Sequence, residues 1–88
     1  MEVLISDHAK FEADRRDISL DIIRKVSQAP QQEIGSISGR TVCQSKMHDP
    51  ATGREMLFRI IVKDTGDLRK VITVYKTSKI EKYWKVDD

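Results

Sequence analysis

The chain has 88 residues, which is enough for one domain, because single hydrophobic cores usually occupy about 50 to 200 residues. Hydrophobic residues make up 39% of it, charged residues 34%, and the net charge is +2, which excludes a disordered chain. The single cysteine, Cys43, excludes a disulfide framework and a Cys/His zinc site. There is no run of about 18 apolar residues and no lysine-rich leader. We therefore expect a single domain over residues 1–88 that is cytoplasmic, does not touch the membrane, and uses no cofactor and no metal.

The first elements are a short strand and a helix. Residues 3–5 (VLI) predict the strand, and Ser6 or Asp7 then provides a cap for a helix over residues 8–16. Serine and aspartate are favoured at this position because their side-chain oxygens accept hydrogen bonds from the free N–H groups of the first turn. A histidine, His8, therefore stands at the start of the leading helix.

The second helix is framed by clear start and stop signals. Ser19 caps it, Ile18 and Ile23 have the spacing of a hydrophobic staple, and Pro30 ends it. A polar passage over residues 31–39 follows, with one short strand expected at residues 34–37.

After Gly39 the hydrophobic period changes from 3.6 to 2, which indicates strands. We expect strands over residues 40–48, 54–63 and 69–77, joined by the hairpin sequences DPATG and DTGD. The order of elements predicts an α+β fold with two N-terminal helices packed on one face of a three- to four-stranded twisted antiparallel sheet. The other face of the sheet is left open, and the conformation of residues 78–88 is undecided.

Alternation along the strands assigns side chains to the two faces. In the middle strand we expect a core side and an open side, the core side being Met56, Phe58, Ile60 and Val62. In the last strand Ile72 and Val74 are expected in the core, opposite Val71, Thr73, Tyr75 and Thr77. The open face would then carry Arg59, Lys63, Thr73, Tyr75 and Thr77. Cations beside hydroxyl groups suit a phosphodiester, but the same pattern also fits the ordinary polar face of a half-buried sheet.

Positive charge is concentrated near the end of the chain. Residues 1–44 carry six Lys/Arg against seven Asp/Glu, a balance of −1, whereas residues 45–88 carry ten against seven, a balance of +3. Between residues 69 and 85 six cations face only Glu81, with Tyr75, Tyr83 and Trp84 nearby. Cations bind phosphates and aromatic rings stack on bases, so a polyanion surface is one interpretation. A solvated Lys-rich edge strand is the other.

His8 is the candidate for proton transfer. The partial positive charge at a helix start disfavours an imidazolium, and a neutral imidazole can act as a general base. The alternative is that His8 only caps or packs beside Ser6 and Asp7. Arg15 lies on the side of His8 and Glu12, whereas Arg16 is placed to form a surface ion pair with Glu12, which weakens its functional case.

Several chemistries lack their motifs. There is no Gly-rich phosphate loop, no G-x-S-x-G elbow, no H-E-x-x-H pattern, and no cluster of carboxylates on one strand face. What remains is metal-free cleavage of RNA, in which the neighbouring 2'-OH is the nucleophile. The protein then only removes and donates protons and stabilises the charge on phosphorus.

Three short motifs carry a family resemblance: S-D-H-A at the first helix, R-R-D-I-S leading to a second helix that ends at A-P, and the late V-I-T-V-Y-K-T. With them the chain resembles the RelE-like small toxins of the barnase, EndoU, colicin and RelE ribonuclease superfamily, and within it a poorly characterised stand-alone domain family. The resemblance covers nearly the whole chain. It implies the same α+β layout and an active site on the sheet near the first helix.

The resemblance also implies site residues and partners. His8 matches the early histidine of the family, Arg16 the arginine before the Ile, and Thr73 the late threonine, while Arg59 and Tyr75 fit by strand position. Many relatives are toxins of bacterial toxin–antitoxin pairs that cut messenger RNA, often at the ribosome, and are silenced by an antitoxin peptide. The net charge of +2 departs from the more basic ribosome-dependent members.

The combined hypothesis is a metal-independent endoribonuclease, the toxin of a bacterial type II pair, with an RNA substrate and a cognate antitoxin as partners and ribosome association left open. His8 would move protons, Arg16 and Arg59 would hold the phosphate, and Thr73 and Tyr75 would position it or donate a proton. Further RNA contacts are expected from Arg15, Lys63, Lys76, Lys79 and Lys82. The alternative is a non-catalytic nucleic-acid or protein-binding module on the same fold, including a gyrase-directed toxin.

Overall fold

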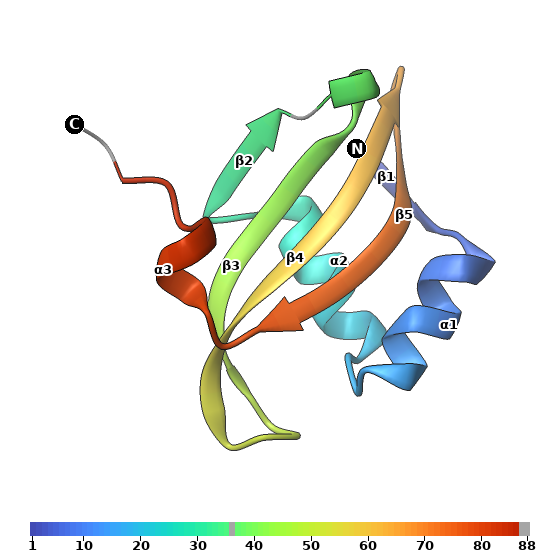
Figure 1. Ribbon diagram of the computed structural model, residues 1–88. Coiled ribbons are helices and arrows are strands. Elements are labelled where there is room, and N and C mark those ends of the chain that lie inside the picture. The colour runs from blue at the N-terminus through green and yellow to red at the C-terminus, as the bar shows by residue number, and fades with distance from the viewer. Residues whose placement is uncertain (36, 87–88) are drawn as a thin grey trace.

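Five strands and three α-helices follow one another along residues 1–35 and 37–86, the part of the chain that the computed structural model describes (Figure 1). In chain order they are β1 (Glu2–Ile5), α1 (Asp7–Arg15), α2 (Leu20–Gln28), β2 (Gln32–Gly35), a short 3-10 turn (Ile37–Gly39), β3 (Thr41–Asp49), β4 (Arg54–Thr65), β5 (Leu68–Thr77) and α3 (Ile80–Tyr83). The α+β class is confirmed. No helix among these residues is long and apolar enough to cross a bilayer.

The sheet has the strand order β1-β5-β4-β3-β2. Its central strands pair antiparallel as consecutive hairpins, whereas β1 pairs parallel with β5. The expected sheet of three to four antiparallel strands was therefore wrong, because both four-residue segments join it at its edges and make a mixed, five-stranded sheet. The short strand expected at residues 34–37 begins earlier, as β2, and its residue 36 lies outside the described residues.

Both expected serine caps begin helices. The hydroxyl oxygen of Ser6 accepts a hydrogen bond from the N–H of Ala9, and that of Ser19 accepts one from Ile22, each at 3.1 Å. The Ser6 hydroxyl also donates to the backbone oxygen of Ile72 at 3.3 Å, which fixes the start of α1 against β5. Capping serines of this kind stabilise a helix by about 1 kcal/mol.

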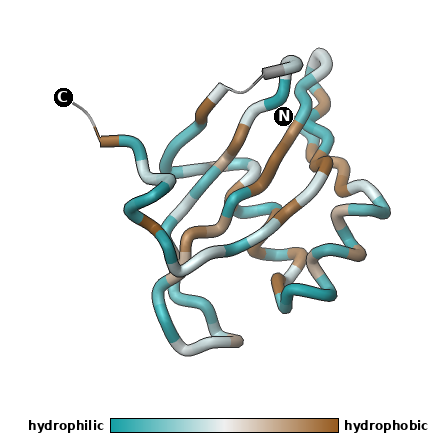
Figure 2. Tube along the Cα trace, in the orientation of Figure 1, coloured by the Kyte–Doolittle hydropathy of each residue, from teal (hydrophilic) through white to brown (hydrophobic). Residues whose placement is uncertain are grey.

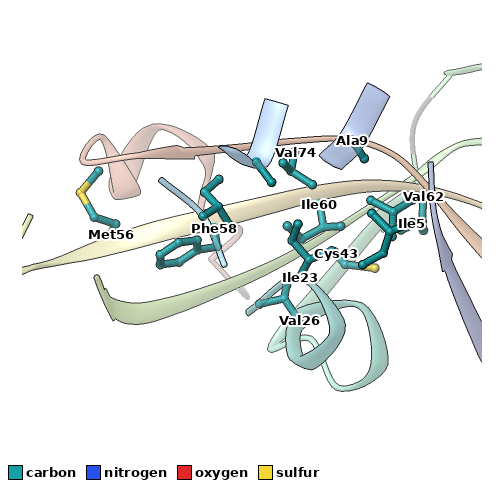
Figure 3. Packing of buried hydrophobic residues seen from close by; sticks show 13 residues of the cluster. Ile5, Ala9, Ile23, Val26, Cys43, Met56, Phe58, Ile60, Val62 and Val74 are labelled. Atoms are coloured by element: carbon teal, nitrogen blue, oxygen red, sulfur yellow. The ribbon is translucent and has the colours of Figure 1, made fainter. Parts of the chain in front are cut away.

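The hydrophobic core lies between the sheet and the helices α1 and α2 (Figure 3). Figure 2 shows the same pattern along the chain, with hydrophobic residues concentrated in the middle of β4 and β5 and mostly hydrophilic residues at the β3–β4 hairpin. Phe58 is the largest side chain of this core, and Ile18 and Ile23 of the predicted staple belong to it. Its members are Ile5, Ala9, Ala13, Ile18, Ile23, Val26, Cys43, Met56, Phe58, Ile60, Val62, Val71 and Val74.

A β-bulge in β5 changes the face of two predicted residues. Ile61 pairs with Thr73, but the next residue of β4, Val62, pairs with Val71, so Ile72 is the extra residue. Val71 is consequently buried in the core and Ile72 is only half-buried, which makes the sequence-based assignment of these two residues wrong. Strict alternation fails here because a bulge inserts one residue into one strand.

The opposite side of the sheet, which we call the outer face, is not entirely open. It carries the strand residues that alternate with the core set, namely Gln44, Lys46, Leu57, Arg59, Ile61, Lys63, Thr73, Tyr75 and Thr77. The segment after β5 is hydrogen-bonded to this face at Tyr83, through Gln44 of β3, and at Lys85, through Gln32 of β2. Leu57 and Gln44 are fully buried although they point away from α1 and α2.

The bulge makes a stability prediction. Val71→Thr places a hydroxyl in the core and is expected to reduce the free energy of unfolding by about 1 to 3 kcal/mol. Ile72→Thr changes a half-buried residue and is expected to have a smaller effect. Urea denaturation of both variants measures the difference. An equal or larger loss in Ile72→Thr would mean that β5 follows simple alternation.

Candidate functional site

Arg59 is the centre of a polar cluster on the outer face. Its Nε donates a hydrogen bond to Oε1 of Gln44 at 2.9 Å, and its NH1 donates to the hydroxyl of Tyr75, the residue directly opposite it on β5. The guanidinium also lies over the ring of Tyr83, 4.3 Å from the ring centre. Two of its five N–H groups thus serve to orient it, and the half-buried guanidinium keeps further donors for a ligand.

The cluster is anchored by two glutamines. Nε2 of Gln44 donates to Oε1 of Gln32 at 2.7 Å and to the backbone oxygen of Tyr83 at 3.2 Å. Gln32 in turn bonds both the N–H and the carbonyl of Lys85, at 3.1 and 2.7 Å. Amide groups whose hydrogen bonds are all satisfied hold one geometry, so these bonds fix the position of the C-terminal segment relative to the Arg59 side chain.

Tyr75 and Tyr83 lie next to Arg59, and Trp84 follows Tyr83 in the chain; each of these three rings has a cation over it. Arg59 lies over Tyr75 as well as Tyr83, and the two tyrosine rings meet edge to face with centres 6.4 Å apart. Lys82 lies 5.3 Å from the centre of the Tyr83 ring, and Lys46 lies 3.9 Å from that of Trp84. Such interleaved cations and rings are the elements of single-stranded nucleic-acid binding.

Two further predicted residues share the outer face. Thr73 lies two residues before Tyr75 on β5 and opposite Ile61, and it is half-buried. Lys63 is exposed near the far end of β4, where it pairs with Lys70. The structure therefore brings Arg59, Thr73, Tyr75 and Lys63 onto one face, with direct contact only between Arg59 and Tyr75.

His8 and the helix arginines form a separate group along α1. His8 is exposed and lies near Glu12, whose carboxylate receives the Nε–H of Arg16 at 2.9 Å. Arg15 approaches the same carboxylate at 3.8 Å. The hydrogen bond from Arg16, aided by the nearby charge of Arg15, lowers the pKa of Glu12. Among the described residues no hydrogen bond or ion pair links His8 to Thr73, Tyr75 or Arg59.

Lys76 does not belong to the outer face. It lies opposite Phe58 and points to the helix side, where its ammonium group donates to the buried carboxylate of Asp49 at 2.8 Å and to the backbone oxygen of Asp17 at 3.2 Å. Lys76 thereby ties the β3–β4 hairpin to the α1–α2 connection. Lys79, which precedes α3, and Lys82, which lies in it, are exposed in contrast.

Arg69 is a structural residue as well. Its guanidinium makes a two-pronged bond with Asp64 at 2.8 Å, binds Glu33 at 2.8 Å and donates to the carbonyl of Ser27 at 2.7 Å. Burial raises the pKa of the adjacent Cys43 thiol to about 11, so that cysteine stays protonated at neutral pH. Part of the basic block seen in the sequence is therefore neutralised inside the protein.

The sequence analysis missed Gln32, Gln44 and Lys46. Gln44 and Lys46 could have been found by extending the alternation to the first hairpin strand, because they pair with Arg59 and Leu57 and so share their face. Within residues 1–35 and 37–86 no three His, Cys, Asp or Glu side chains gather into a metal site.

Comparison with known proteins gives no relative for this chain: no family model, no curated protein and no solved structure matches it.

The Asp49–Lys76 pair predicts an acid-sensitive component of stability. Burial by itself would raise the pKa of Asp49, but its hydrogen bonds with Lys76, Thr52 and the Ala51 N–H outweigh burial and lower it. A carboxylate with a depressed pKa stabilises the fold above the unfolded value of about 4, and this contribution is lost as pH falls through the folded value.

The free energy of unfolding should therefore fall less between pH 7 and pH 3 in Asp49→Asn than in the wild-type protein. Lys76→Met leaves an unpaired buried carboxylate and should cost about 3 kcal/mol at pH 7. Lys25→Met, at an exposed lysine of α2, is the control. Urea titrations at both pH values test this, and an acid response identical in wild type and Asp49→Asn would contradict it.

Proposed function

We propose that this protein is a metal-independent endoribonuclease, the toxin of a bacterial toxin–antitoxin pair with a RelE-like arrangement of its fold. The observation that supports it is the Arg59–Tyr75 pair, in which a guanidinium and a phenol are hydrogen-bonded across β4 and β5 and oriented by Gln44. A planar, fixed donor fork beside a hydroxyl matches the oxygens of a phosphodiester.

In this proposal the 2'-OH of one ribose attacks the adjacent phosphorus, and the bond to the 5' oxygen of the next nucleotide breaks. The proton of the 2'-OH passes to a base, for which His8 is the candidate. Because α1 packs on the face of the sheet opposite to Arg59 and Tyr75, this role requires His8 to reach the RNA from the edge of β5. Arg59 stabilises the charge that develops on the phosphate oxygens, and Tyr75 donates a proton to the leaving 5' oxygen. The products are a 2',3'-cyclic phosphate and a 5'-hydroxyl end, with no metal ion involved.

The surroundings of the pair fit an RNA-directed protein. Thr73 and Lys63 share its face, and the exposed Lys79 and Lys82, at the start of α3 and within it, would attract a polyanion. An antitoxin would inhibit the toxin by covering this surface. Lys76 and Arg69 have no part in the proposed site, since both are held by internal carboxylates.

One observation favours a second function, a non-catalytic module that binds nucleic acid or protein on the same face. Tyr83 lies over Arg59, and no described contact brings His8 to the Arg59–Tyr75 pair. A binding surface needs the cations and rings but no proton acceptor beside them. Steeply salt-dependent binding without turnover would support this function, including the gyrase-directed form.

The catalytic proposal predicts RNA cleavage in EDTA that yields 2',3'-cyclic phosphate ends, detected by end-group analysis of a labelled RNA. Arg59→Ala should slow cleavage about 10² to 10³-fold and Arg59→Lys nearly as much, because lysine keeps the charge but not the fork. His8→Ala should slow it about 10²-fold or more.

Arg24→Ala, at an exposed arginine of α2, is the matched control and should leave the rate unchanged. Circular dichroism establishes that each variant is folded. Absence of cleavage in EDTA would reject the nuclease, and cleavage unaffected by His8→Ala would reject the role of that histidine.

A further inference from the structure

We propose that Trp84 and Lys46 form a stacking subsite for an unpaired RNA base, with the phosphate beside that base held in the adjoining hollow next to α3. This inference rests on the proposed function in taking RNA as the ligand. It adds a binding position on the β3 side of the Arg59–Tyr75 pair, formed by residues that take no part in the proposed cleavage step.

The fold places the Trp84 ring through its backbone neighbours. The carbonyl of Tyr83 accepts a hydrogen bond from Gln44, and both the N–H and the carbonyl of Lys85 bond Gln32. Trp84 itself is extended, with φ −71° and ψ 127°, between these two fixed residues. The backbone on both sides of Trp84 is thus held by strands β2 and β3, and Trp84 stays only partly buried.

Lys46 gives this position its charge. It comes from β3, opposite Leu57, and its ammonium group stands 3.9 Å from the centre of the Trp84 ring. Because the ammonium group lies over the ring, a base that stacks on this face of the indole takes its place, and the displaced ammonium group pairs with the phosphate linked to the base. The site therefore provides both partners that a nucleotide needs, a ring for the base and a cation for the phosphate.

The hollow beside α3 is large enough for a nucleotide. It measures about 620 Å³, within the range of small-molecule sites, and Lys46 lines both it and the Trp84 position. Its other charged lining residues are Lys79 and Lys82 against Glu55 and Glu81. With three ammonium groups and two carboxylates, the hollow has a net charge of +1. This charge suits one phosphate better than several phosphates of a long strand.

Stacking also selects for single strands. The faces of bases in a duplex are covered by their neighbours, whereas unpaired bases are free to stack on an aromatic side chain. Tyr83 and Trp84 are consecutive residues, and Arg59 lies over the first and Lys46 over the second. One strand could therefore pass from the Arg59–Tyr75 pair to Trp84 with a base at the end of its path.

Trp84 is the only tryptophan of the chain, so its fluorescence reports directly on this contact. The probe is a single-stranded 2'-O-methyl hexauridylate, which cannot be cleaved because its 2' oxygens are blocked. We expect saturable quenching of Trp84 by this strand and little quenching by the same length of duplex RNA. Heparin, a polyanion without bases, should compete for binding but not quench.

Variants are measured by fluorescence anisotropy of a labelled hexauridylate. Trp84→Ala should weaken binding about tenfold and Lys46→Met about threefold to tenfold. The controls are Phe11→Ala, an exposed ring on α1, and Lys25→Met on α2, both expected within twofold of wild type. Thermal melting identifies any variant that is unfolded. The quenching experiment uses the wild-type protein and so does not depend on the folding of any variant.

The outcomes separate the subsite from the nuclease. Quenching without cleavage of unmodified RNA would support the subsite and reject the nuclease. Cleavage without quenching would support the nuclease and reject the subsite. Binding that leaves Trp84 fluorescence unchanged, equal quenching by heparin, absence of any binding, or unchanged affinity in Lys46→Met would each overturn the subsite.

Discussion

The register of β4 against β5 is the constraint on which the rest of the structure depends. It sets Arg59 opposite Tyr75, and these two residues form the centre of the candidate site. The same pairing contains the bulge at Ile72. Because of this extra residue, Val71 points into the core while Thr73 and Tyr75 remain on the outer face. Without that extra residue, one part of β5 would present its side chains to the wrong face.

Ion pairs divide the cations of this small protein into two groups. Arg69 and Lys76 are held by Asp64 and Asp49 and connect the sheet to the α2 end and the α1–α2 turn. Arg59, Lys46 and Lys82 instead lie over aromatic rings on the outer face. A guanidinium or ammonium group paired with a carboxylate is neutralised, whereas one over a ring keeps its charge for an anion. Of these five cations, the three that keep their charge for an anion all lie on the outer face.

The C-terminal segment links stability to the proposed function. Gln32 and Gln44 bond its backbone rather than its side chains, so the segment adds a partial third layer and leaves its aromatic rings at the surface. In the proposed site this layer supplies both Tyr83, which lies over Arg59, and Trp84, which lies under Lys46. The function we propose is thus built from a hairpin, the last strand and the segment that follows it.

The sequence alone determined the elements of the fold, because caps, turn residues and hydrophobic periods are local properties. Ser6, Ser19, Pro30 and the two hairpin sequences predicted the helices and the three long strands, and alternation placed Arg59 and Tyr75 on one face. Only the tertiary structure decided the pairing of the two short edge strands, the bulge at Ile72, the internal partners of Lys76 and Arg69, and the docking of residues 80–86. Each of these depends on contacts between residues far apart in the chain, and such contacts leave no local pattern in the sequence.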